Sequence, residues 1–237
     1  MGWTGRWRRC VVSVVPGCAC HTSLMAHSEP SFARDLVELI VGYGIIMLAI
    51  WTPEGPQRIL SPIALVVTLA IVLARRQSRE ELGFGLRGLW RSFWILPVAA
   101  GLAVVGVLVA RRLGTFHPLY HPDMQHVVGY VLWTIYQQFL LNDYFMPSLT
   151  RILGRETVAL AVTAVLFSAA HLPNFWLAAA TLVWGAVSCA LFRRYHNIYA
   201  LGLAQGVLGL CFAVCVPDTL IHHLRVGLGY LRYHAAR

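Results

Sequence analysis

Long apolar runs, separated by short polar connections, recur along most of the chain. The runs cover residues 36–52, 59–75, 93–110, 127–146, 157–172, 175–192 and 198–216. Their lengths approach the roughly 20 residues that a helix needs to cross the hydrocarbon core of a bilayer. Each run is predicted to be helical because a backbone in lipid must satisfy its own hydrogen bonds, and no strand-like alternation competes. The pattern therefore predicts an all-α, polytopic transmembrane helix bundle of about seven helices.

Composition and charge also indicate a membrane protein. Hydrophobic residues make up 58% of the sequence and charged residues 12%, about half of the ~25% typical of soluble domains. The basic residues are all arginines, and they cluster between the apolar runs. That distribution fits the positive-inside rule better than a phosphate-binding surface. It predicts an integral protein of the bacterial inner (plasma) membrane, surrounded by membrane lipid, with a cytoplasmic N-terminus and no nucleic-acid partner.

The order of runs and loops divides the chain into four parts. Residues 1–30 form a basic leader, expected to be disordered or to precede a true start at Met25. Residues 31–126 hold the N-terminal transmembrane helices and a long basic cytoplasmic loop, and residues 217–237 form a C-terminal tail. Residues 127–216 form a core that concentrates the polar residues of the apolar runs.

The polar residues of this core follow helical spacing. They are Gln137, Gln138, Asn142, Asp143, Ser168, His171, Asn174 and Gln205. Gln138 and Asn142 are four residues apart and share a helix face, as do Phe167 and His171. Pro173 is predicted to end or kink the fifth helix directly after the histidine. Together these groups predict an interior cavity formed by helices four to seven, although for the glutamine of the seventh run alone a hydrogen bond between helices is the simpler interpretation.

With these residues identified, the segment from about residue 130 to residue 209 resembles the CPBP family of CAAX-protease and bacteriocin-processing membrane proteins. Its FxxxH motif is present as "FSAAH", with Phe167 and His171. The resemblance implies a membrane endopeptidase in which glutamates and histidines surround the water that attacks a peptide bond. It also implies a hydrophobic peptide, or a prenyl-like or lipid-like chain, as the substrate.

Two other motifs of the family are altered in this sequence. Gln137 and Gln138 stand where the EExxxR motif has its two glutamates, and Asn142 replaces the arginine. In the late HxxxN or HxxxD motif, Gln205 replaces the histidine and Gly209 the asparagine or aspartate. Because an amide does not titrate usefully, neither glutamine can act as the general base. A divalent metal would also lack its expected carboxylate ligands, since amide oxygens are weaker ligands.

Three functions stay open at this point. The first is an intramembrane peptidase that uses His171 as base, with side-chain amides donating to the oxyanion. The second is a non-catalytic relative that binds a hydrophobic peptide or lipid, and the third is a lipid- or isoprenoid-modifying enzyme. The candidate catalytic residues are Gln137, Gln138 and His171, and the candidate cavity-lining or supporting residues are Asn142, Phe167, Asn174 and Gln205.

Overall fold

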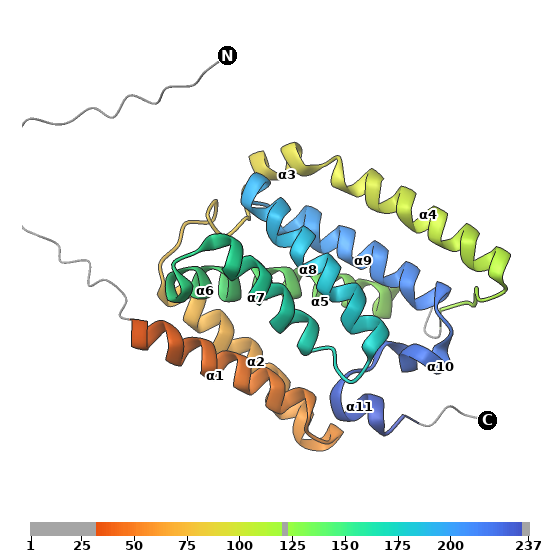
Figure 1. Ribbon diagram of the computed structural model, residues 1–237, viewed down its shortest axis with the longest axis horizontal. Coiled ribbons are helices and arrows are strands. Elements are labelled where there is room, and N and C mark those ends of the chain that lie inside the picture. The colour runs from red at the N-terminus through yellow and green to blue at the C-terminus, as the bar shows by residue number, and fades with distance from the viewer. Residues whose placement is uncertain (1–31, 120–122, 234–237) are drawn as a thin grey trace, which may run out of the picture. The chain divides into compact units, whose positions relative to one another are not determined.

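The computed structural model describes residues 32–119 and 123–233. The leader of residues 1–30, with Met25, lies outside the described residues. The predicted apolar runs are all helical (Figure 1): α1 (Phe32–Ile50), α2 (Glu54–Ala74), α4 (Ile95–Leu113), α5 (Met124–Phe139), α7 (Glu156–Ala169), α8 (Phe175–Tyr195) and α9 (Ile198–Cys215). The described ranges contain no strand. The predicted all-α, polytopic helix bundle is therefore confirmed.

Four helices of the described ranges are long and apolar enough to cross a membrane, namely α2, α4, α8 and α9. The helix α7 is apolar but shorter, and α1 carries Arg34, Asp35 and Glu38 within its first two turns. Many large hydrophobic side chains on these helices are exposed and lie outside the cavity described below, among them Val66 and Val109. Such an apolar outer surface is the one that lipid tails cover.

Small residues allow close packing of α9, which contacts both α4 and α5. A Cβ atom added at Gly202 would come within 2.7 Å of the Ile135 Cα atom on α5. Because that atom belongs to the backbone, it cannot move aside as a flexible side chain would. The two helices approach each other as closely as they do because residue 202 has no side chain.

We expect Gly202→Ala to lower the free energy of unfolding by about 1–3 kcal/mol, because the extra methyl group must push α5 and α9 apart. Gly129→Ala is the matched control in α5, where an added Cβ meets no atom within 4 Å. That control should be neutral or slightly stabilising, since alanine favours helix more than glycine does. Thermal unfolding of both variants in detergent measures the difference, and equal transition temperatures would contradict the packing argument.

The fourth predicted helix is longer than its apolar run and changes its hydrogen-bond pattern in the middle. After α5 the chain forms a π-helical segment, η1 (Leu140–Phe145), and then α6 (Met146–Leu153). All six residues of η1 are buried. A π-helical turn inserts one extra residue into a helix and is often found at functional sites. Here it directly follows the two glutamines of the altered motif.

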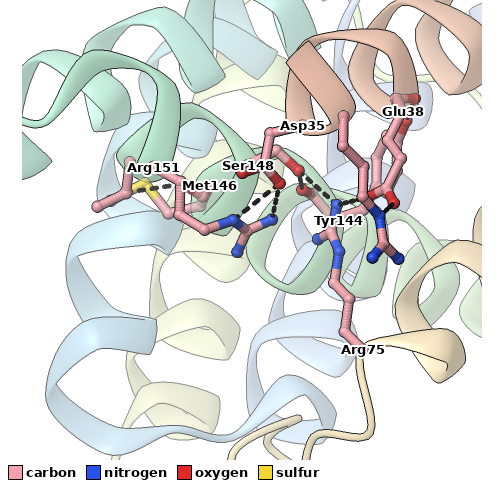
Figure 2. A network of polar contacts seen from close by, with 9 residues as sticks. Asp35, Glu38, Arg75, Tyr144, Met146, Ser148 and Arg151 are labelled. Carbon is pink, nitrogen blue, oxygen red and sulfur yellow. Dashed lines mark hydrogen bonds and ion pairs between the residues drawn. The ribbon is translucent and has the colours of Figure 1, made fainter. Parts of the chain in front are cut away.

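Ion pairs tie α1 to the end of α2 and to α6 (Figure 2). Arg151 of α6 donates from Nε and Nη2 to the same Asp35 oxygen, Oδ1, at 2.8 and 2.7 Å. Arg75, at the end of α2, donates to Glu38 at 2.8 Å and to Ser148 at 2.9 Å. These contacts hold three helices together at one end of the bundle.

The remaining short helices lie in the connections. The basic loop after α2 contains α3 (Leu86–Ser92), whose Trp90 side chain is exposed. The tail after α9 folds into α10 (Asp218–Ile221), a 3₁₀ turn η2 (His222–Leu224) and α11 (Gly227–Leu231). These elements of the tail pack against α8 and α1.

Candidate functional site

Gln138 is the centre of a buried hydrogen-bond network inside the bundle. Its Oε1 atom accepts from Asn142 Nδ2 at 2.9 Å and from the Ser188 hydroxyl of α8. Its Nε2 atom donates to Gln205 Oε1 of α9 at 2.6 Å. The side chains of Gln138, Asn142 and Ser188 are fully or almost fully buried. The i, i+4 relation predicted for the glutamine and asparagine is thus a direct contact.

The network continues from Gln205 to the other glutamine of the pair. Gln205 Oε1 also accepts from the indole N–H of Trp184 at 3.0 Å. Gln205 Nε2 donates to Gln137 Oε1 at 2.5 Å. The amides therefore form a directional chain from Gln138 through Gln205 to Gln137, in which each carbonyl oxygen accepts from the preceding group. In a low-dielectric interior such a chain is strongly favoured when all its members are paired.

His171 lies in the turn after α7, where Pro173 follows it. Its Nδ1 atom is 2.7 Å from the Phe167 carbonyl oxygen. Because a carbonyl can only accept, Nδ1 carries the proton and Nε2 has a free lone pair. No hydrogen bond reaches Nε2 from the described residues. The Phe167 ring packs edge-on against the imidazole, with ring centroids 4.9 Å apart, so both residues of the FxxxH motif fix the orientation of this ring.

A single cavity of about 730 Å³ brings several of the predicted residues together. Gln137, Phe167, His171 and Gln205 line it, together with aliphatic and aromatic side chains. Its size is typical of sites for small hydrophobic ligands. Beyond helices four to seven of the prediction, α1, α2, α4 and the tail also contribute to the wall, with Tyr43, Ser61, Leu102 and Leu224 among the lining residues.

The other three predicted residues are not among the residues lining the cavity. Gln138 and Asn142 lie behind Gln205, within the hydrogen-bond network described above. Asn174 begins α8, where its Oδ1 accepts from the Leu177 amide at 3.1 Å, and it also contacts the tail. These three side chains therefore support the site without lining the cavity.

Ser188 and Trp184 belong to the site but received no site role from the sequence. They are four residues apart on α8 and share a face, which points to Gln138 and Gln205. A polar residue and a tryptophan at this spacing in an apolar run are a signal that could have revealed them. The signal was weak because serine also serves in close helix packing and tryptophan in lipid contact.

Asp143 is the carboxylate nearest in sequence to the altered motif, but the structure keeps it away from the cavity. It is buried in η1, and its Oδ2 atom has no hydrogen-bond partner among the described residues. Within the described ranges, no three His, Cys, Asp or Glu side chains come together as a possible metal site. Amide oxygens are weak substitutes for carboxylates. The residues of this cavity therefore do not fit a divalent metal.

The fold and the cavity define an integral membrane protein with an internal hydrophobic pocket. Residues 121–211 match the model of the family described as Rce1-like, type II CAAX prenyl endopeptidase Rce1-like. The match supports membership of the CPBP, or CAAX-protease, family, which the motifs of this segment predict. The matched segment includes Gln137, His171 and Gln205. Neither a curated protein nor a solved structure matches the chain.

Proposed function

We propose that this CAAX-protease-family protein binds a hydrophobic chain, prenyl-like or lipid-like and carried on a peptide, without efficient hydrolysis. The observation that carries the proposal is the directional amide chain of Gln138, Gln205 and Gln137. Its members occupy the positions where the family has two glutamates and a histidine, and Gln138 and Gln205 bond to other side chains of the network. The cavity has the volume and the apolar walls for such a ligand, but none of its described lining residues is a carboxylate that could activate water.

The polar groups that remain open to the cavity are suited to orienting a ligand. Gln137 Nε2 makes no hydrogen bond to any described residue, so its two N–H groups are available to a peptide carbonyl. His171 Nε2 can accept a hydrogen bond from a peptide N–H. A few polar groups in an apolar pocket fix the orientation of a ligand while its hydrophobic part supplies most of the affinity.

A photoactivatable farnesylated peptide, added to the protein in lipid nanodiscs, tests the binding. We expect cross-links to map to cavity residues on α8 and α9. Ala180→Trp should reduce the yield by about tenfold or more, because residue 180 lines the cavity and the indole would occupy ligand space. Ala100→Trp is the matched control, since Ala100 is exposed on α4 and does not line the cavity. An equal yield from both variants would contradict binding in the cavity.

Slow peptide hydrolysis is a second candidate, favoured by the free lone pair of His171. In this reaction His171 Nε2 removes a proton from water as the water oxygen attacks the peptide carbonyl carbon. Gln137 N–H donates to the developing oxyanion, and the imidazolium returns the proton to the leaving amine, which gives a carboxylic acid and an amine. Cleavage of the same peptide by wild-type protein, abolished by His171→Ala, would establish this candidate in place of pure binding.

A further inference from the structure

The tail after α9 forms part of the cavity wall. Residues 217–233, hereafter the strap, contain α10, η2 and α11 and pack against α8 and α1. Leu224 and Val226 of the strap line the same cavity as His171. Because the strap lies outside the helices long and apolar enough to cross a membrane, it can move without unfolding one of them.

The strap contains a left-handed turn at the edge of the cavity. His222, His223 and Leu224 have φ angles of 47°, 53° and 58° in succession. Left-handed backbone places Cβ close to the following carbonyl oxygen, so residues other than glycine adopt it singly and seldom in a row. Strained segments of this kind persist where the surrounding structure holds them, and they are common at ligand clamps and switches.

Asn174 holds this turn from both sides. Its Nδ2 atom donates to the Ile221 carbonyl at 2.8 Å and to the Arg225 carbonyl at 3.2 Å. These two carbonyls flank the left-handed turn, one residue before it and one residue after it. The asparagine side chain is completely buried, and its bond to the Ile221 carbonyl is buried as well.

Gly227 of the strap contacts both the turn that holds His171 and the end of α1. The Gly227 amide donates to the Leu172 carbonyl at 2.8 Å, within the turn that also holds His171. Gly227 has a φ angle of 54°, and a Cβ atom there would collide with Ile50 at the end of α1. The exposed pair of Arg225 and Glu54, 3.8 Å apart, adds little in comparison.

We propose that the strap is a lid over the His171 end of the cavity, that the left-handed turn is its hinge and that Asn174 is its latch. Release of the two Asn174 hydrogen bonds opens the cavity to a hydrophobic chain. The role in ligand entry rests on the function proposed above, whereas the latch itself is testable without any ligand.

The chain provides a matched control for the latch. Asn197 starts α9 as Asn174 starts α8: its Oδ1 accepts from the Ala200 amide at 2.9 Å, and it is also completely buried. Its Nδ2 donates to two carbonyls of a distant loop, those of Gly83 and Gly85, at 3.3 and 3.2 Å. Serine keeps the helix-capping role at either position but cannot reach both carbonyls.

Two readouts in nanodiscs test the latch. Trypsin cleaves after Arg225, whose carbonyl Asn174 holds, so mass spectrometry of this cut reports strap release. N-ethylmaleimide labelling of the thiol introduced by Ala180→Cys reports access to the cavity. We expect Asn174→Ser to accelerate tryptic cleavage and thiol labelling by about tenfold each, the order expected for two lost hydrogen bonds. Gly227→Ala should act in the same direction without touching the α8 cap, and Asn197→Ser should change neither rate.

If Asn174→Ser and Asn197→Ser change the two rates equally, or if neither changes them, Asn174 is not the latch of the strap. Faster cleavage after Arg225 without faster thiol labelling would overturn the lid, because the strap would then move without opening the cavity. If both rates rise as expected while the farnesylated peptide still cross-links nowhere in the cavity, the lid stands and the proposed ligand is wrong.

Discussion

Gln138→Ala is expected to destabilise the protein by about 3 kcal/mol, because several buried partners lose their hydrogen bonds at once. Asn142, Ser188 and Gln205 each bond to this side chain, which is itself completely buried. A buried donor without a partner costs about 1–3 kcal/mol. Thermal unfolding in detergent, monitored as the loss of monodisperse protein, measures the effect as a lowered midpoint temperature.

Gln137→Ala is the matched control for this prediction. Gln137 is half-buried, borders the cavity and makes one side-chain hydrogen bond, to Gln205. We expect a loss near 1 kcal/mol, the usual contribution of one such bond. If both alanine variants unfold at the same midpoint, Gln138 is not the centre of the network and the unequal roles assigned to the two glutamines are wrong.

The unequal roles also bear on restoring the family motif. A carboxylate at position 137 would face the cavity and could accept the existing hydrogen bond from Gln205 Nε2. At position 138, the atom that replaces Nε2 would be an oxygen facing Gln205 Oε1, so two acceptors would meet. The network therefore disfavours an ionised group at position 138 unless Gln205 reorients. The site has adapted to amides at more than one position, which supports binding over hydrolysis.

The helical architecture was predictable because lipid leaves the chain little choice. An apolar run of sufficient length must be helical, so the runs alone located α1, α2, α4, α5, α7, α8 and α9. The π-helical segment η1 was not predictable, since a one-residue insertion does not disturb an apolar run that is buried on all sides. The strap was missed because its contacts depend on side chains of α8 and α1 that are distant in sequence.

The sequence located the cavity better than it located the roles of single residues. Spacing correctly paired Gln138 with Asn142, and the FxxxH motif correctly placed Phe167 beside His171. Spacing alone could not show which amide faces the cavity, because Gln137 and Gln138 are adjacent and the packing of the neighbouring helices decides which of them meets the pocket. Only the packed structure separates the cavity-facing glutamine from the buried one.

Arg151→Ala is expected to have the largest effect on stability, about 3–5 kcal/mol, because it leaves a buried carboxylate without its counter-charge. The Asp35 side chain is 4% exposed, and Arg151 donates two hydrogen bonds to it (Figure 2). Asp35 also joins α1 to α6, and α1 supplies part of the cavity wall. The variant should therefore unfold at a markedly lower temperature and lose cross-linking to the farnesylated peptide as α1 loosens.

Arg193→Ala is the control for this ion pair, because Arg193 and Glu156 pair at the surface with side chains 39% and 49% exposed. Exposed pairs contribute about 0–1 kcal/mol, so its unfolding midpoint should stay close to that of the wild type. The double variant Asp35→Asn, Arg151→Gln should recover much of the loss, since it removes the unpaired charge together with its partner. A double variant as unstable as Arg151→Ala would show that the arginine acts through packing on α6, and the electrostatic explanation would fail.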